Sequence, residues 1–300
     1  MTPSTTTRII LSALALAASG LAHATNYSLW INGRSNPDGT VGAAADFDYW
    51  GPAQPGGVKP GVNPIAVNWD GKSHISTTND GVRKALDCYC TGSNWCYVAV
   101  HSAGNLQIGY ALSKYGNTPR NATAVPTDGV CTGATGGAAQ TGWNIKFVDV
   151  AAGAAGGSEL ADTGAWAMSE ELVQDLKTTT ARALYDHNIT QGVNLYMYAG
   201  AKGAVTSAVL KGQNDSVVAY HSTGGTSGTS GTRLCNPGQS SITCPNDLTL
   251  GTAVNEGGST KWSFHSVVFR DDAESFDHYA HGNWEGVVSK VLTHMVNTAK

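Results

Sequence analysis

Short apolar runs alternate with longer segments of helical periodicity along the chain from Tyr27 onward. The short runs are rich in β-branched and aromatic residues, which favour strands, and six of them fit one sheet. They predict strands at Tyr27–Ile31, Pro64–Trp69, Trp95–Val100, Ile145–Val150, Val193–Ala199 and Trp262–Phe269. The longer segments predict helices at Asp80–Cys88, Leu106–Tyr115, Ser169–His187 and Gly282–Thr298. This alternation is typical of α/β proteins with a mostly parallel central sheet covered by helices.

The last two predicted helices are amphipathic, and Ser169 before two glutamates resembles an N-cap with an acidic first turn. Glycine-rich loops lie between the predicted elements, notably at Ala151–Gly157 and Ser222–Thr243. A loop as long as the second is uncommon unless it has a function or is disordered. We expect it to lie at the rim of a functional site.

The first 24 residues form a segment distinct from the rest. Arg8 is followed by an apolar run from Ile9 to Leu21, and Ala22-His-Ala24 has the small-x-small form of a signal-peptidase site. The run is too short to span a bilayer, and no later stretch provides the roughly 20 apolar residues that a membrane-spanning helix needs. We therefore expect residues 1–24 to be a signal peptide and residues 25–300 to form one secreted domain without a transmembrane anchor.

The charge of the chain restricts its partners. The net charge is −4, only 13% of residues are charged, and the sequence contains no basic stripe that could neutralise a phosphate backbone. Nucleic acid is therefore excluded as an expected partner. The same composition gives no reason to expect attraction to an anionic membrane surface.

Six cysteines form an even set in a chain predicted to be exported: Cys88, Cys90, Cys96, Cys131, Cys235 and Cys244. Because disulfides persist outside the reducing cytosol, this set favours three bridges, with Cys235 paired to Cys244 within the long loop. The connectivity of the other four cannot be read from their spacing. A metal site is the alternative for Cys88-Tyr-Cys90, but no second pair at zinc-ligand spacing follows it.

Candidate chemistry begins at Ser102, in the run Val98-Ala-Val-His-Ser-Ala-Gly104 between a predicted strand and a predicted helix. Small residues around a serine in a strand-turn-helix context are the pattern of a nucleophile elbow. The N–H of the next residue, Ala103, would then be one oxyanion donor. The match to G-x-S-x-G is partial, because Val100 replaces the first glycine, and an ordinary strand-to-helix turn is the competing interpretation.

In hydrolases with such an elbow, an acid and then a histidine follow the serine in the chain. Asp215 lies in a turn rich in glycine and asparagine after the strand predicted to end at Ala199, although it could also be a solvated turn residue. Two histidines, His278 and His281, stand shortly before the last predicted helix. Their spacing would also allow a metal pair, but no third ligand follows, and His101 and His265 are less suited to act as the base.

These residues resemble those of the secreted bacterial lipases, and more distantly the extracellular polyester depolymerases, of the α/β-hydrolase superfamily. Three further segments carry the likeness: Gly156-Gly-Ser-Glu-Leu-Ala-Asp162, Asn214-Asp-Ser-Val-Val-Ala-Tyr-His-Ser222, and Asp277-His278 with Asn283 five residues beyond the histidine. The likeness covers the chain from Trp30 to Trp284, and the shared order of its motifs is more specific than any one of them. The Asp-His pair and the asparagine spacing favour His278 over His281 as the base.

The resemblance implies a disulfide-stapled α/β-hydrolase that cleaves carboxylic esters with Ser102, His278 and Asp215. It matches the lipase oxyanion turn to Asn32-Gly-Arg34, so that the Arg34 N–H becomes the second donor; asparagine replaces the usual histidine, and Trp69-Asp-Gly71 is a rival. No cofactor is needed, and no acidic cluster specifies the calcium ion that some lipases carry. The alternatives are a polyester depolymerase and a hydrolase-fold binding protein that has lost its chemistry.

Overall fold

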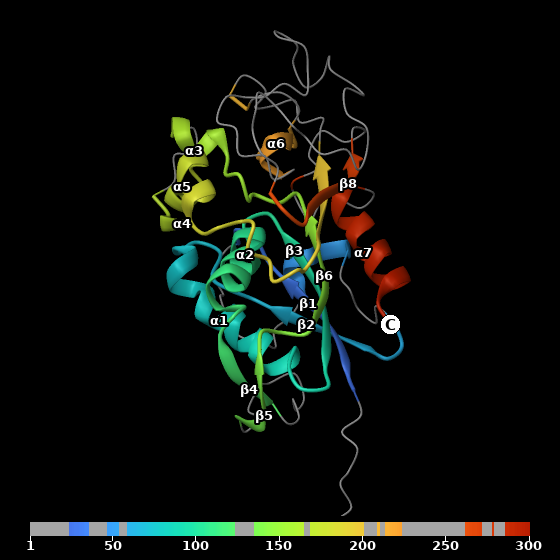
Figure 1. The fold of residues 1–300 in the computed structure, drawn as a ribbon. Helices are drawn as coiled ribbons and strands as arrows, with labels where there is room; N and C mark the ends of the chain where they lie inside the picture. The colour runs from blue at the N-terminus through green and yellow to red at the C-terminus, as the bar shows by residue number, and fades with distance from the viewer. Residues whose placement is uncertain are drawn as a thin grey trace, which may run out of the picture.

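Six parallel strands form the central sheet of the protein (Figure 1). The computed structural model describes residues 24–35, 47–53, 59–123, 135–164, 169–200, 209–210, 214–223, 262–271, 278 and 286–300. The strand order is β2-β1-β3-β6-β7-β8, and every neighbouring pair is parallel. The strands are β1 (Asn26–Ile31), β2 (Val62–Val67), β3 (Trp95–His101), β6 (Ile145–Ala151), β7 (Leu195–Gly200) and β8 (His265–Asp271). The predicted mostly parallel sheet is therefore confirmed.

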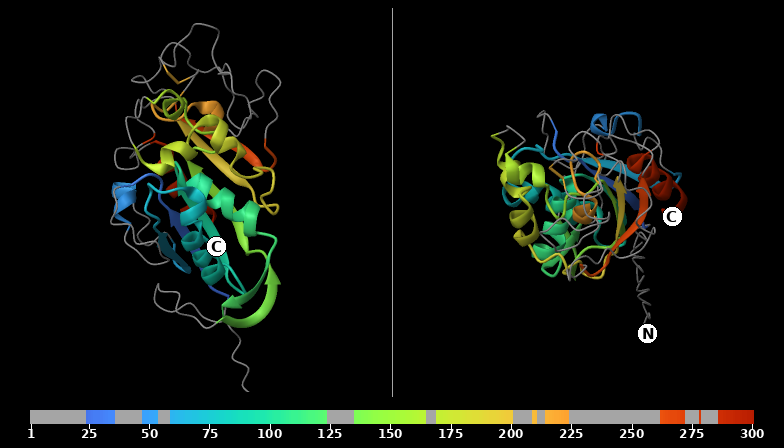
Figure 2. Two further views of the ribbon diagram at one scale, coloured as in Figure 1. Left: turned by 90° about the vertical axis from the view of Figure 1, so that its left-hand side faces the viewer. Right: turned by 90° about the horizontal axis from the view of Figure 1, so that it is seen from above.

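Helices cover both faces of this sheet, as the view from above shows (Figure 2). Helices α1 (Ile75–Tyr89) and α2 (Gly104–Tyr115) pack on one face, whereas α7 (Val287–Thr298) and the short 3-10 helix η1 (Asp48–Ala53) pack on the other. Alternate residues of β3 enter the two cores: Val98 and Val100 face α1 and α2, and Tyr97 and Ala99 face α7. Burial on both faces explains why β3 is an unbroken apolar run.

One predicted helix is wrong. The segment Ser169–His187 contains two short helices, α4 (Glu171–Asp175) and α5 (Thr178–Ala183), with Glu170 rather than Ser169 at the N-cap of α4. Lys177 breaks the helical path with ψ of 138°, and Asp162 accepts hydrogen bonds from both the N–H and the hydroxyl of Thr178, at 2.9 and 2.7 Å. A carboxylate from a distant segment therefore stabilises the break, which periodicity within the segment cannot indicate.

Helix α1 begins five residues before the predicted start at Asp80, because its cap is also non-local. The N-cap residue His74 makes no capping hydrogen bond through its side chain. Instead, the Asp175 carboxylate accepts the Ile75 N–H at 2.7 Å and contacts His74 Nδ1 at 2.9 Å. A carboxylate at a helix N-terminus both satisfies an unpaired donor and complements the helix dipole.

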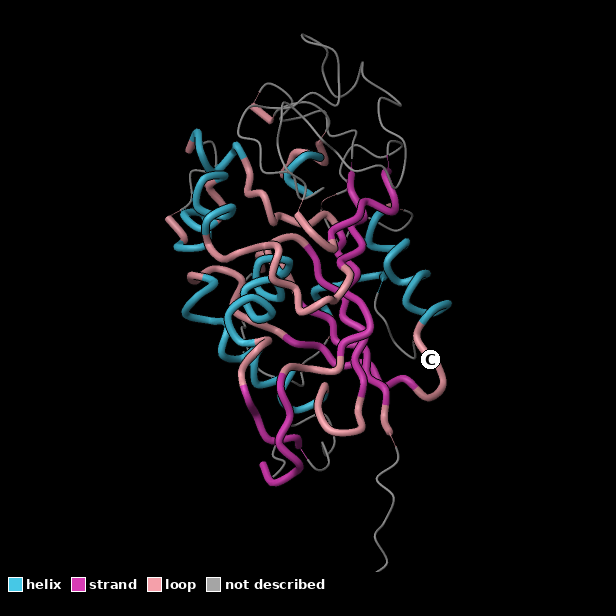
Figure 3. Tube along the Cα trace, viewed as in Figure 1, coloured by secondary structure: helices cyan, strands magenta, loops and turns pink. Residues whose placement is uncertain are grey.

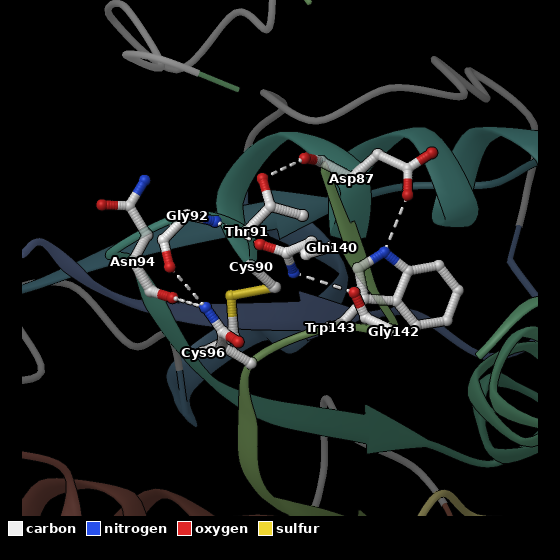
Figure 4. Close-up of a disulfide and its surroundings, with 10 residues drawn as sticks. Asp87, Cys90, Thr91, Gly92, Asn94, Cys96, Gln140, Gly142 and Trp143 are labelled. Atoms are coloured by element: carbon white, nitrogen blue, oxygen red, sulfur yellow. Dashed lines mark hydrogen bonds between the residues drawn. A yellow bond between two sulfur atoms is a disulfide. The ribbon is translucent and has the colours of Figure 1, made fainter. Parts of the chain in front are cut away.

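An antiparallel hairpin that sequence analysis missed, β4 (Pro119–Thr123) with β5 (Thr135–Thr141), lies beside α1 (Figure 3). A Cys90–Cys96 disulfide joins the end of α1 to β3 in the same region (Figure 4). Around it, Gln140 accepts the Gly92 N–H at 2.7 Å, and Asp87 accepts the Trp143 indole N–H at 2.8 Å. Cys88 is also disulfide-bonded.

The remaining described helices are α3 (Glu159–Thr163) and α6 (Tyr220–Thr223), which follow β6 and the turn at Asp215. Several predictions lie outside the described residues: the signal peptide up to residue 23, most of the 222–243 loop, Cys131, and the Cys235–Cys244 bridge. No helix in the described part of the chain has the length and apolar character needed to cross a membrane.

Helix α7 is fixed to the sheet by a buried carboxylate as well as by apolar packing. His294 Nδ1 lies 2.7 Å from Oδ2 of Asp149, which is fully buried in β6. Burial raises the pKa of Asp149 to about 6, and the hydrogen bond to Asp149 raises the pKa of His294. Both groups therefore hold protons to higher pH in the folded chain than in the unfolded chain.

This pair predicts a pH-dependent stability. The charged form of His294 contributes stability that is fully present below the unfolded pKa of about 6.5 and is lost as pH rises through the raised pKa. The contribution of protonated Asp149 is likewise lost as pH rises from 3.8 to about 6. His294→Gln keeps a donor but not the charge, so we expect it to lower the free energy of unfolding more near pH 6 than near pH 9. Urea denaturation at both pH values measures this, and an equal loss at both would contradict the ion pair.

Candidate active site

Ser102 lies in a strained turn between β3 and α2. Its φ is 53°, in the left-handed region that residues other than glycine rarely adopt. The Ser102 N–H donates to the Ala151 carbonyl at 3.0 Å, and the Ser102 carbonyl accepts the Asn105 N–H at 3.1 Å. These bonds join the turn at Ser102 to the end of β6 on one side and to the first turn of α2 on the other. The local conformation is that of a nucleophile elbow.

Two glycines allow the chain after β1 to approach this turn. A Cβ on Gly104 would lie 2.7 Å from the Asn32 carbonyl oxygen, and a Cβ on Gly33 would lie 2.6 Å from Ser102 Cβ. Neither position can hold a side chain without moving backbone or the serine itself. Val100, the departure from the glycine pattern, is fully buried between the sheet and the helices α1 and α2. The valine is therefore accommodated in the strand while the serine keeps its strained conformation.

Asp215 lies in a tight, fully buried turn. Its Oδ1 accepts the Val217 and Val218 N–H groups at 2.9 and 2.6 Å, and its own N–H donates to the Val218 carbonyl at 3.1 Å. Two backbone donors to one oxygen fix the orientation of the carboxylate and compensate for its burial. The second oxygen, Oδ2, is directed at His278. Asp215 is therefore a structured acid in this turn rather than a solvated turn residue.

His278 links this carboxylate to the serine. Its Nδ1 lies 2.8 Å from Asp215 Oδ2, and its Nε2 lies 2.8 Å from Ser102 Oγ. Because a carboxylate only accepts, Nδ1 carries the proton, and Nε2 accepts the hydroxyl proton of Ser102. All three side chains are at least nine-tenths buried. The arrangement is a continuous hydrogen-bonded chain from acid to base to hydroxyl, built from the carboxyl-end region of the parallel sheet.

The other histidines considered from sequence occupy different positions. His281 lies outside the described residues. His265 is buried at the start of β8, where its Nδ1 contacts the Ser263 carbonyl at 2.8 Å. His101 precedes Ser102, but its ring nitrogens contact Tyr49 and the His278 backbone carbonyl. Among the described histidines, His278 is the one hydrogen-bonded to the serine hydroxyl.

The two sequence-predicted oxyanion positions flank the serine turn. The Ala103 N–H has no hydrogen-bond partner among the described residues, as a donor awaiting a ligand would require. Arg34 follows Gly33 in the turn that contacts Ser102, and its guanidinium makes two 2.7 Å bonds to Glu170. Because Glu170 binds the Arg34 guanidinium, the role expected for Arg34 at the serine is that of its backbone N–H.

Asn32, which stands where the resemblance places histidine, fastens this turn to the end of β2. Its Nδ2 donates to the Trp69 carbonyl at 3.1 Å, and its Oδ1 accepts the Trp69 N–H at 3.0 Å. The Trp69 indole N–H returns a bond to the Asn32 carbonyl at 2.6 Å. Trp69, the start of the rival oxyanion segment, therefore supports the turn after β1.

Sequence analysis missed a contact between two of the quoted lipase-like segments. Ser158 caps α3 by accepting the Leu160 N–H at 3.2 Å, and its hydroxyl donates to the Val217 carbonyl at 2.5 Å. Gly156 lies against Ser222, because a Cβ there would be 2.7 Å from Ser222 Cα. The 156–162 segment therefore supports the turn of Asp215. The serine before Glu-Leu-Ala-Asp was a readable N-cap signal, but its second partner is non-local.

No family model matches the chain, and no curated protein sequence matches it. Two solved structures share its fold at low identity. A lipase from Bacillus licheniformis in propeptide form aligns with 92% of this chain at 12% identity and a TM-score of 0.51, and the chain spans about half of its length, 51%. Lipase 1 from Pelosinus fermentans aligns with 92% of this chain at 11% identity and a TM-score of 0.51, over 99% of its own length. The chain therefore has a fold similar to that of bacterial lipases.

The hydrogen bonds of Asn32 predict that replacing its side chain lowers the free energy of unfolding more than an ordinary surface substitution does. Asn32→Ala leaves the buried backbone groups of Trp69 without partners, so we expect the free energy of unfolding to fall by about 2–4 kcal/mol. Asn63→Ala on neighbouring β2 is the matched control, because Asn63 is exposed, and its cost should stay within about 0.5 kcal/mol. Urea denaturation of both variants gives the comparison. Equal costs would mean that Asn32 does not hold the turn.

Proposed function

We propose that this protein is a secreted serine hydrolase of the α/β-hydrolase fold that cleaves carboxylic esters, as lipases and esterases do. The observation that carries the proposal is the hydrogen-bonded chain Asp215–His278–Ser102, with 2.8 Å at each link. Such a chain lets the imidazole take the hydroxyl proton while the carboxylate stabilises the imidazolium that forms. The fold similarity to two bacterial lipases supports the choice of ester substrates.

The reaction follows from the positions of these groups. His278 Nε2 takes the proton of Ser102 as Oγ bonds to the ester carbonyl carbon, and the negative charge develops on the carbonyl oxygen. The Ala103 and Arg34 N–H groups donate to that oxygen. His278 then gives its proton to the leaving alcohol, which leaves an acyl group on Ser102. Water, deprotonated by His278, then attacks the acyl carbon. The bond from that carbon to Ser102 Oγ breaks, His278 returns the proton to Oγ, and the acid leaves.

The cellular context belongs to the same proposal. Residues 1–24 act as a signal peptide, and residues 25–300 form the exported catalytic domain. The Cys90–Cys96 disulfide supports an oxidising compartment, in which such bonds persist. No nucleic-acid partner and no transmembrane anchor are part of the proposal. Its substrates are small or polymeric esters.

The triad predicts losses that do not add. Ser102→Ala and His278→Ala should each lower kcat for p-nitrophenyl ester hydrolysis by roughly 10⁴-fold or more, and the double variant should be scarcely worse. The reason is that the hydroxyl and its base act in one step, so removing either removes the step. Steady-state kinetics on purified, folded variants provide the measurement.

His281→Ala is the matched control, because it removes a histidine from the same segment. It should retain most of the wild-type kcat. If His281→Ala is inactive and His278→Ala is active, the base is His281. If Ser102→Ala keeps wild-type turnover, the proposed function is wrong.

A further inference from the structure

A second hydrogen-bonded chain runs behind the serine. His101, the last residue of β3, is only 3% exposed and directly precedes Ser102. Its Nδ1 contacts the Tyr49 hydroxyl, and its Nε2 contacts the backbone carbonyl of His278. The hydroxyl of Tyr49, in η1, also lies against Gly33, because a Cβ on Gly33 would be 2.7 Å from the hydroxyl oxygen. The chain thus runs from Tyr49, which lies beside the turn after β1, to the main chain of the proposed base.

For a neutral His101, the carbonyl at the end of this chain fixes its direction. A carbonyl oxygen only accepts, so His101 Nε2 carries a proton. In a neutral imidazole the other nitrogen, Nδ1, is then an acceptor, and the Tyr49 hydroxyl donates to it. Burial raises the pKa of Tyr49, which keeps that hydroxyl proton in place. The Tyr49 hydroxyl thus donates to His101, and His101 donates to the His278 carbonyl.

A neutral His101 is also compatible with the charge that His278 acquires in the proposed mechanism. The ring centroids of His101 and His278 are 5.2 Å apart. In the proposed mechanism His278 becomes positively charged, and a second charge at this distance in a buried site would oppose that step. An imidazole whose two nitrogens are committed to Tyr49 and a carbonyl holds its position without adding charge.

We propose that His101 and Tyr49 are positioning residues that set the main chain of His278 relative to the oxyanion turn. The inference rests on the proposed function. The two ring nitrogens of His278 contact Asp215 and Ser102. The backbone carbonyl of His278 is a third, separate contact, and it is the one that His101 makes. Tyr49 in turn packs against Gly33, where a Cβ would lie 2.7 Å from the Tyr49 hydroxyl oxygen and 2.6 Å from Ser102 Cβ. One network thereby sets the base, the nucleophile and the oxyanion turn.

The test removes one hydroxyl. Tyr49→Phe keeps the ring but breaks the chain, so we expect kcat for p-nitrophenyl esters to fall about 10-fold to 100-fold while KM changes less than about 3-fold. Tyr97→Phe is the matched control. Tyr97 is buried, and its hydroxyl accepts the Lys300 N–H at 3.0 Å and donates to the Lys300 carbonyl at 3.2 Å. Tyr97 lies near the start of β3, five residues before Ser102, and its hydroxyl bonds to Lys300 rather than to His101 or His278, so its loss should leave kcat within about 2-fold of wild type.

A conservative variant separates positioning from packing. His101→Gln offers a donor to the His278 carbonyl and should retain more kcat than His101→Leu, which fills the space without polar groups. If Tyr49→Phe loses no more kcat than Tyr97→Phe, or if Gln and Leu at position 101 behave alike, the positioning role is overturned.

A spectroscopic measurement keeps this inference separate from the proposed function. Imidazole ¹⁵N shifts of the wild-type protein should place the His101 proton on Nε2, and the Nδ1 signal should move in Tyr49→Phe. A proton on Nδ1 overturns the chain whatever the activity. If the spectrum agrees but Ser102→Ala hydrolyses esters as wild type does, the proposed function fails and the network stands.

Discussion

Ser102 is held at a φ of 53°, and most of the surrounding structure is arranged to keep it there. A strained residue of this kind costs about 1–3 kcal/mol and persists only where its surroundings over-determine it. Here the serine is bonded through its backbone to β6 and α2, and the turn after β1 approaches so closely that Gly33 and Gly104 have no room for a side chain. The strain directs Oγ away from the sheet toward His278.

The parallel sheet supplies the remaining geometry. Strand β3 is central, with β1 on one side and β6 on the other, so the segments that follow these three strands meet at one edge. Asp215 and His278 come from later parts of the chain. Backbone hydrogen bonds within the turn of Asp215 orient its carboxylate toward the imidazole. The acid, the base and the hydroxyl are hydrogen-bonded in the fold, although Ser102 and His278 are 176 residues apart in the sequence.

Sequence predicted those features that depend on local chemistry. The six strands of the central sheet were predicted near their observed bounds, because buried strands are apolar runs, and a turn at Ser102 was expected from small residues between a strand and a helix. Tertiary partners decided the rest. The break after α4 depends on Asp162, the start of α1 depends on Asp175, and Tyr49 reaches His101 from a segment with no strong periodicity. None of these partners is marked by spacing. The choice between His278 and His281 depended on resemblance, and the geometry supplies a physical reason for His278.

The central claim is that Ser102 is an activated nucleophile, and covalent labelling tests it most directly. A fluorophosphonate probe reacts with a serine whose hydroxyl is activated by a neighbouring base and not with an ordinary buried or surface serine. After treatment of the folded protein, peptide mapping by mass spectrometry should find one adduct, on the peptide that contains Ser102, and His278→Ala should abolish it. An unlabelled protein, or an adduct on another residue, would contradict the claim.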